Sequence, residues 1–517
     1  MVMKETGSFA VEWDDPADAE ITWSYDGMHN PAPIVPLGQH LNRVNNEVVF
    51  GGRTLYVNGY AFALMSGPPM PSPEVFSRGL SIWTDDYVPR LQEFCRGVVA
   101  RDYSALSAEA LVGELDQLVV GAADHFKLTM VVILPFMAPT YELLGMAEAE
   151  LGQDGPRLVG TLLQGYENAT ATAGLGLGVL AERAKAWPEV ARLLRAGDYD
   201  GIAHTAGGPD FLVDLRAYLD EFGWRLETWS TVHIPTWAED PSVPLALIAR
   251  YLGDGAATPS DAVARSAQDR EMARAEIEAR LDPATRERFL ALLERTQAHV
   301  SISESRAHWQ LTLFGVLRRP ILVLGSKLMQ AGIIERPDDV FYLYWHEAAA
   351  AAREPRGSLA AVVAERRAEV ERWGTLTPPP FLGAAPPQDL GPGAIFARHF
   401  FGVGVARSTE DRVITGIGAS RGSVTGRARV IASLADSHRL EVGDVLVCAT
   451  TAAPWTPLFA VAGAVVTDTG GVLSHSAICA REFAIPAVVG TQVGTRAIPE
   501  GALVTVDGEQ GTVRIEA

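Results

Sequence analysis

The sequence has few cysteines and a deficit of basic residues. Three scattered cysteines, Cys95, Cys448 and Cys479, among 517 residues favour neither a disulfide framework nor a zinc site. Lysine and arginine number 43 against 63 aspartates and glutamates, which gives a formal charge of -20. Because nucleic-acid binding needs basic side chains to neutralise phosphates, we expect no nucleic-acid partner.

The sequence also shows no pattern typical of a secretory signal or of a membrane span. The opening residues, MVMKETGSFAVEW, do not show the basic-then-apolar pattern of a secretory signal. No apolar run approaches the roughly 18 residues that span a bilayer. We therefore expect a cytoplasmic protein with no membrane partner, long enough for two to four domains.

One ordered string in the sequence carries chemistry. It reads TDTGGVLSHSAICAREFAIPAVVG and covers residues 467–490. The apolar segments AGAVVTD (462–468) and IPAVVG (485–490) predict buried strands at its two ends. Ser474 is a good N-cap, which predicts a short helix over residues 475–483.

His475, the first residue of that helix, is the candidate phosphoryl carrier. Gly470 and Gly471 allow a sharp turn and a close backbone approach, so with Ser474 they are candidate phosphate-binding residues at a helix N-terminus. An imidazole with a pKa of about 6.5 supplies a neutral nucleophile near pH 7. Cys479 is expected to be a small buried apolar residue. The alternative is an ordinary histidine at a helix start, but the ordered string favours the carrier.

The string resembles the phosphohistidine, or swivelling, domain of the phosphoenolpyruvate-utilising enzymes. That group includes phosphoenolpyruvate synthase, pyruvate phosphate dikinase and rifampicin phosphotransferase. The resemblance extends through GIGASRGSVTGRARVI (416–431), APWTPLF (453–459) and VTVDGEQGTVRI (504–515). It implies a C-terminal α/β swivelling domain over residues 412–517, with His475 phosphorylated on Nε2.

The preceding sequence predicts helices and a hinge. Residues 375–411 are rich in proline and glycine and predict a linker, while EVVFGGRTLYVNGYAF (47–62) predicts a hairpin around its Gly-Gly pair. We predict an α+β multidomain fold: a mainly α-helical N-terminal substrate domain (1–374), the Pro/Gly linker, and the C-terminal α/β domain. The predicted helical segments lie near 104–121, 122–150, 157–186, 188–196, 210–222 and 261–352.

The helical part also resembles a known domain. LLQGYENATATAGLGLGVLAERA (162–184), FGWRLETWSTVHIPTWAEDP (222–241) and LRRPILVLGSKLMQAGIIERPDDVFYLYWHEA (317–348) are similar to the substrate-binding domain of rifampicin phosphotransferases. At Trp224 many relatives have the histidine of a Gly-His-Arg sequence, so no histidine role carries over. Trp224 and Trp309 are candidate lining residues of an acceptor pocket, with ordinary core packing as the alternative.

The segment SISESRAHWQ supplies further candidate catalytic residues. Glu304 and His308 share a helical face, so the carboxylate could orient the imidazole as a general base. Arg306 resembles the phosphate-contacting arginine of rifampicin phosphotransferases, whose lysine four residues later is Gln310 here. A solvated helix face is the alternative. His125 is a second possible base, with a structural histidine as the alternative.

No phosphoryl-donor site is evident in the sequence. It has no Gly-rich loop with a following Gly-Lys-Ser/Thr, it lacks the ATP-grasp domain of rifampicin phosphotransferase, and the 42 residues after His475 do not fit a pyruvate-binding barrel. The arrangement is similar to phenylphosphate synthase and the cresol-phosphorylating enzymes. That resemblance implies a separate ATP-grasp-type subunit that binds ATP and Mg²⁺, and no metal or tightly bound cofactor on this chain.

The resemblance implies an ATP-dependent phosphotransferase. ATP, water and a small hydroxylated acceptor, a phenol or alkylphenol, would give the phosphorylated acceptor, AMP and phosphate. The alternatives are a phosphorylation-driven dehydratase of an alcohol, a phosphotransferase for a larger natural product or antibiotic, and a non-catalytic scaffold or relay. The intact motif around His475 weighs against the last.

Overall fold

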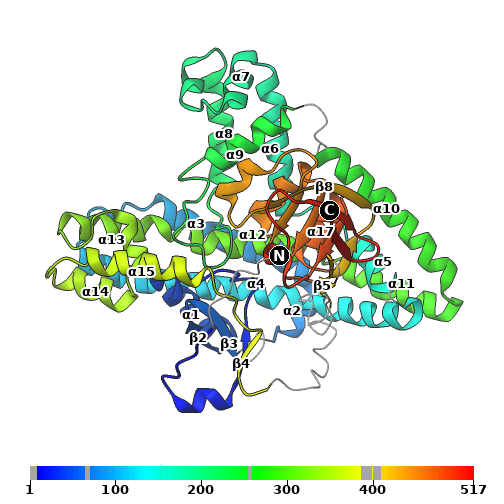
Figure 1. Cartoon of the computed structure of the whole chain (residues 1–517), viewed down its shortest axis with the longest axis horizontal. Helices are drawn as coiled ribbons and strands as arrows, with labels where there is room; N and C mark the ends of the chain where they lie inside the picture. Colours follow the sequence, from blue (N-terminus) through cyan, green and yellow to red (C-terminus); the bar gives the residue numbers. More distant parts are fainter. Residues whose placement is uncertain are drawn as a thin grey trace. The chain divides into compact units, whose positions relative to one another are not determined.

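The computed structural model describes residues 9–64, 70–152, 154–253, 259–385, 399, 409–410 and 412–516. It combines many helices with two sheets, so the predicted α+β class is confirmed (Figure 1). Most of the predicted linker, comprising residues 386–398, 400–408 and 411, lies outside the described residues, and the two predicted domain boundaries stay predictions.

Two compact units make up the chain. The first comprises Met1–Val132, Thr228–Pro235 and Trp309–Gln388. The second comprises Ile133–Glu227, Thr236–His308 and Asp389–Ala517. His475 and Glu304 both belong to the second unit.

The first unit contains a four-stranded antiparallel sheet in the order β2-β3-β1-β4. The strands are β1 (Thr22–Tyr25), β2 (Arg53–Val57), β3 (Tyr60–Leu64) and β4 (Phe381–Gly383). β4 is an edge strand within the predicted linker. Its Leu382 is buried with Trp23 and Phe62, so apolar burial fixes this part of the Pro-rich segment to the sheet.

The predicted hairpin exists, but its turn is not at the Gly-Gly pair. Residues 47–50 form the end of α1 (Pro36–Phe50), and Gly51 is its left-handed C-cap with φ 58°. The turn lies at Asn58 and Gly59, with φ values of 50° and 73°. Asn-Gly suits a two-residue hairpin turn because both positions need positive φ.

Helices form the rest of the first unit. They are η1 (Pro16–Glu20), α1, α2 (Pro73–Ile82), the π-helical η2 (Trp83–Tyr87), α3 (Val88–Ala100), α13 (Arg318–Gln330), η4 (Pro337–Tyr342), α14 (Trp345–Arg353) and α15 (Ala360–Trp373).

Helix α4 (Ala108–Leu151) is one continuous element of 44 residues that begins in the first unit and ends in the second. The predicted break near residue 121 is absent. By length and composition this helix could cross a membrane, contrary to the sequence expectation, although 44% of its most apolar window is buried inside the fold. Burial of this kind is also found in the core helices of proteins with no membrane span.

The second unit contains the other helices of the middle region. They are α5 (Asp154–Leu162), α6 (Ala169–Lys185), α7 (Pro188–Ala196), η3 (Asp200–His204), α8 (Gly208–Phe222), α9 (Ser242–Tyr251), α10 (Pro259–Arg280), α11 (Pro283–Gln297) and the first part of α12 (Val300–Gly315). The predicted helix 157–186 is broken because Asn168 caps α6, its side chain accepting a hydrogen bond from the Ala171 amide at 2.9 Å.

The C-terminal part of the second unit is a nine-stranded sheet in the order β5-β6-β13-β12-β8-β9-β10-β11-β7. Strands β8 to β11 run parallel to one another, and the other pairs are antiparallel. The elements are β5 (Thr409–Glu410), β6 (Val413–Thr415), β7 (Ile417–Ser420), β8 (Ser423–Val430), η6 (Leu434–Arg439), β9 (Val445–Cys448), η7 (Ala453–Ala460), β10 (Ala464–Thr467), α17 (His475–Glu482), β11 (Ala487–Val489), α18 (Gly494–Ala497), β12 (Leu503–Asp507) and β13 (Thr512–Ile515). The buried strands predicted on either side of His475 are confirmed as β10 and β11.

One apolar core of the second unit joins helices α6 to α9 with the sheet region. Ile248 of α9 and Leu177 of α6 belong to the same buried cluster as Leu458 and Phe459 of η7. The Tyr251 hydroxyl also donates to the Pro457 carbonyl oxygen at 3.1 Å. The helices and the His475 region therefore share one core.

Candidate active site

The imidazole of His475 lies at the start of α17, with 13% of its side chain exposed. Its Nδ1 lies 2.8 Å from Oε2 of Glu304, a residue of α12 that is 171 positions away in the sequence. Because a carboxylate only accepts hydrogen bonds, Nδ1 carries the proton in this contact. Nε2 is then the nitrogen available for chemistry.

Two small polar groups line Nε2. The Thr456 hydroxyl lies 3.3 Å from it and the Cys479 sulfur 3.4 Å. Both residues are buried, Thr456 on η7 and Cys479 one turn after His475 on α17. Cys479 is buried as expected, but it also touches the imidazole.

The electrostatics favour a charged histidine–carboxylate pair. Burial lowers the pKa of His475, but Cys479 and the Glu304 carboxylate more than offset it, so this pKa lies well above 6.5. Burial raises the pKa of Glu304, but His475 outweighs this, and the net direction is downward. Burial also raises the pKa of the Cys479 thiol, against the opposing influence of His475.

Further charged groups surround this pair. Burial, followed by the charge of Glu304, raises the pKa of Glu482 to about 7, and its carboxylate accepts a hydrogen bond from the Gly165 amide at 3.4 Å. Burial lowers the pKa of Arg306, against the opposing influence of Glu304 and then Tyr141. Arg306 is therefore close enough to Glu304 for their charges to interact.

The loop before α17 has the predicted turn and cap. Gly470 has φ 99°, and a β-carbon there would lie 2.7 Å from the Ser474 hydroxyl. That hydroxyl accepts from the Ala477 amide at 3.4 Å and donates to the Gly471 carbonyl oxygen at 2.8 Å. The N-cap prediction for Ser474 is confirmed. The phosphate-binding roles of the two glycines and of Ser474 stay predictions.

The predicted partnership of Glu304 with His308 has a different form in the structure, because the short hydrogen bond of Glu304 goes to His475. His308 packs edge-on against Phe222, with ring centroids 5.7 Å apart. Burial, followed by the charge of Arg225, lowers the pKa of His308 to about 3. Such a weakly basic imidazole is poorly suited to general base catalysis near pH 7.

The remaining predicted residues lie in both units. Trp224 is half-buried in the second unit. Trp309 and His125 belong to the first unit, where His125 Nδ1 lies 2.7 Å from the Gly121 carbonyl oxygen and its ring stacks on Phe94. These contacts are typical of a structural histidine. Sequence reasoning did not single out Thr456 or Glu482, although both lie in segments that carried the family resemblance.

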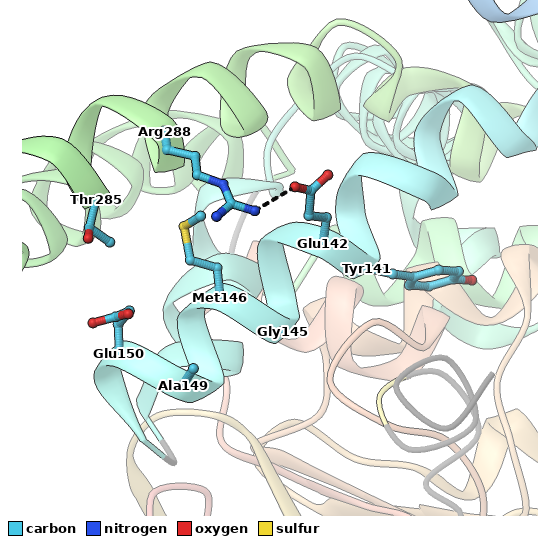
Figure 2. Close-up of a pocket in the computed structure, with 8 residues that line it drawn as sticks. All are labelled: Tyr141, Glu142, Gly145, Met146, Ala149, Glu150, Thr285 and Arg288. Atoms are coloured by element: carbon cyan, nitrogen blue, oxygen red, sulfur yellow. Dashed lines mark hydrogen bonds and ion pairs between the residues drawn. The ribbon is translucent and has the colours of Figure 1, made fainter. Parts of the chain in front are cut away.

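An open groove of about 310 Å³ lies in the second unit between α4 and α11 (Figure 2). It is lined by Tyr141, Glu142, Gly145, Met146, Ala149, Glu150, Thr285 and Arg288. Arg288 and Glu142 form an ion pair of 3.0 Å across it. In Figure 2 the Tyr141 ring points away from this ion pair.

Within the described ranges, no group of three or more His, Cys, Asp or Glu side chains is placed to hold a metal ion.

Comparison with known proteins identifies two domains. Residues 129–304 match the model of the rifampicin phosphotransferase fourth domain, and residues 440–511 match the mobile domain of PEP-utilising enzymes. The first match ends at Glu304, and the second contains Thr456 and His475. The bonded pair therefore brings together one residue from each domain.

Three curated relatives match over large parts of the chain. It is 28% identical to chondramide synthase of Chondromyces crocatus over 98% of this chain and 14% of that protein. It is 30% identical to an uncharacterised phosphotransferase of Bacillus subtilis over 61% of this chain and 37% of the relative. It is 28% identical to rifampicin phosphotransferase of Streptomyces sviceus over 67% of this chain and 40% of that enzyme. The chain thus spans less than half the length of each of these relatives, and two of its segments are similar to domains of rifampicin phosphotransferase and of PEP-utilising enzymes.

Proposed function

We propose that the chain is the phosphohistidine-bearing, acceptor-binding part of an ATP-dependent phosphotransferase. Its C-terminal domain would swivel to collect a phosphoryl group on His475 and deliver it to a hydroxyl acceptor. The observation that carries the proposal is the imidazole of His475, whose Nδ1 is bonded to Glu304 and whose Nε2 lies at the start of a helix. The match to the mobile domain of PEP-utilising enzymes and the phosphotransferase names of two relatives support it.

In the first step Nε2 attacks the phosphorus of the donor. The Nε2–P bond forms from the nitrogen lone pair, and the P–O bond to the leaving group breaks with its electrons going to oxygen. Nε2 must be unprotonated for this step. Glu304 holds the remaining proton on Nδ1, so the phosphorylated ring keeps an N–H at that position.

In the second step the acceptor oxygen attacks the phosphorus. The P–N bond breaks and its electrons return to Nε2. Because Nδ1 still carries its proton, the leaving group is neutral imidazole, which leaves far more readily than an imidazolate anion. The acceptor hydroxyl gives up its proton, and the raised pKa of His475 makes the freed Nε2 a suitable place for it.

The donor and the acceptor are part of the same proposal. ATP would be bound with Mg²⁺ by an ATP-grasp-type partner subunit, with AMP and phosphate as co-products. A phenol or alkylphenol is the first candidate acceptor, and Trp224 and Arg306 of the second unit are proposed to serve its binding. The match to chondramide synthase over nearly the whole chain supports a larger natural product as the second candidate acceptor.

The test is to mix this chain with a candidate ATP-grasp protein and ATP labelled at the β-phosphorus. We expect acid-labile label on this chain, absent from His475→Ala, and discharged by a phenolic acceptor to a stable phosphate ester. A dehydrated product would show that the chain acts in the alternative function, a phosphorylation-driven dehydratase. Equal labelling of His475→Ala would contradict the proposal.

A further inference from the structure

A buried arginine with an incomplete set of partners lies in the second unit, after the end of α8. Arg225 is 4% exposed, and its Nε donates to the Phe222 carbonyl oxygen at 3.0 Å. Its guanidinium carbon lies 5.7 Å from the centroid of the Phe222 ring and 5.6 Å from that of Trp237. Its Nη1 is buried and has no hydrogen-bond partner among the residues that the structure describes.

The charge of Arg225 is not balanced by a nearby carboxylate. Over the part of the chain that the structure describes, none of its ion pairs involves Arg225. Burial lowers the pKa of its guanidinium, and among the described residues the Tyr218 phenol opposes this by its charge and by a side-chain hydrogen bond. Burying an unpaired charge costs free energy, and buried polar atoms of folded proteins almost always have hydrogen-bond partners. A bound ligand would supply the partner that Arg225 lacks.

The neighbours of Arg225 favour an anion. The Tyr218 hydroxyl donates to the Ala173 carbonyl oxygen at 3.1 Å, and the buried His308 is close enough for Arg225 to influence its titration. These groups are neutral or cationic near pH 7. An oxyanion placed against Nη1 would therefore meet a hydrogen-bond donor and a positive charge in an environment with little water.

Two elements connect this cluster to the candidate active site. On α12, His308 lies one helical turn after Glu304, which bonds His475. On α6, Ala173 is followed by Gly174, where a β-carbon would lie 3.8 Å from the Thr456 methyl group. Thr456 in turn contacts Nε2 of His475. The cluster is therefore connected to Nδ1 of His475 along α12 and to Nε2 through α6 and Thr456.

We propose that Arg225 binds an oxyanion of the substrate, so that the natural acceptor is a hydroxyl compound that also carries a carboxylate or phosphate group. The proposal rests on the proposed function and defines its acceptor more narrowly. The hydroxyl would face His475 while the anionic group is held one helical turn away. A released phosphate ion has the same chemistry and is the second source to be distinguished.

The test is equilibrium binding to the whole unphosphorylated chain, measured by calorimetry. The probes are 4-hydroxybenzoate, neutral phenol and inorganic phosphate, and the proteins are wild type, Arg225→Met and Arg225→Lys. We expect 4-hydroxybenzoate to bind the wild type about tenfold to a hundredfold more tightly than phenol. A ratio of roughly this size corresponds to the free energy of one hydrogen bond to a charged group. Arg225→Met should remove that difference and leave phenol binding unchanged, and Arg225→Lys should restore part of it.

A matched control is Arg250→Met. Arg250 of α9 also has a buried Nη1 without a hydrogen-bond partner among the described residues, but it is less buried than Arg225 and the charges of Glu441 and Asp444 act on it. This variant should bind all three probes like the wild type. Arg225→Met should fold and have a raised unfolding midpoint without ligand, because an unpaired buried charge is gone. If inorganic phosphate binds and 4-hydroxybenzoate does not, and this binding is lost in Arg225→Met, then Arg225 forms an anion site whose ligand is phosphate.

Two results would overturn the proposal. One is unchanged binding of every probe by Arg225→Met, and the other is no preference of the wild type for either anion at millimolar concentration. Labelling of His475 by a phosphoryl donor is measured separately, so a failure here leaves the proposed function standing.

Discussion

At the scale of single residues, the contact between Glu304 and His475 decides the chemistry of the site. It fixes the imidazole tautomer and orientation, and it stabilises the positive charge on a ring that is nearly excluded from water. By raising the pKa of His475, the same contact favours the imidazolium form, in which Nε2 also carries a proton. A protonated Nε2 has no free lone pair for nucleophilic attack. The rate of phosphorylation should therefore depend on pH through the titration of His475.

Replacing Glu304 with glutamine tests this dependence. Glu304→Gln removes the negative charge, so burial should lower the pKa of His475 and move the acid limb of the phosphorylation rate down by roughly 1–3 pH units. The measurement is the pH profile of labelling. Glu142→Gln, which changes an exposed carboxylate, is the matched control and should leave the profile in place.

The stability of the variant has a predictable pH dependence. The folded-state pKa of His475 is raised, so the ion pair contributes stability that is complete below about 6.5 and is lost as the pH rises through the folded value. The pKa of Glu304 is lowered, so stability is also lost as the pH falls through its folded value. Glu304→Gln should destabilise the chain most between these limits, and a uniform loss at all pH values would contradict the ion pair.

Sequence reasoning selected both partners of this contact but not the contact itself. Glu304 was assigned to His308 because residues four apart share a helical face, and that local rule is the only geometry a single sequence supplies. A bond between residues 171 positions apart depends on packing of α12 against α17. Thr456 gave no signal of its own, because a threonine in an apolar segment looks like any buried polar residue.

At the scale of elements, the turn before α17 places His475. Gly470 adopts a left-handed conformation that only glycine takes without strain, and Ser474 fills the space that a β-carbon would need. The turn ends in a capped helix whose first residue is the histidine. Small changes in this turn should move the imidazole relative to Glu304 and Thr456.

Gly470→Ala should both destabilise the fold and impair phosphorylation. Backbone strain of about 1 kcal/mol or more is expected from the positive φ alone, with a further cost from the clash with Ser474. Gly501→Ala is the control, since Gly501 has φ 75° but open space around its β-carbon position. Thermal unfolding and labelling of both variants separate the effects: equal losses in the two would show that the turn has no special role.

Element boundaries show where sequence patterns were sufficient. The strands and helix around His475 were predicted because an apolar run, a Gly-Gly pair and a capping serine all occur within 30 residues. The hairpin turn was misplaced because two glycine-containing pairs competed, and the Gly-Gly pair instead ends α1. The uninterrupted α4 was missed because its helical pattern was divided where tertiary packing keeps it continuous.

At the scale of the whole molecule, helices α6 to α9 and the sheet region of the second unit are held by one apolar core. A domain that swivels away from these helices would have to expose part of that core. Ile248→Ala should therefore cost about 2–5 kcal/mol and raise hydrogen exchange in β9 and β10 as well as in α9. Val213→Ala on the exposed face of α8 is the control. Exchange that rises only in α9 would show that the two parts do not share a stabilising core.

The central claim is that Nε2 of His475 carries the phosphoryl group while Glu304 retains the proton on Nδ1. The most direct measurement is ³¹P and ¹⁵N NMR of the chain phosphorylated with phosphoramidate, a small donor that needs no partner subunit. The account predicts a single phosphohistidine, bonded through Nε2 and absent from His475→Ala. A phosphoryl group on Nδ1, or an unchanged signal in His475→Ala, would contradict it.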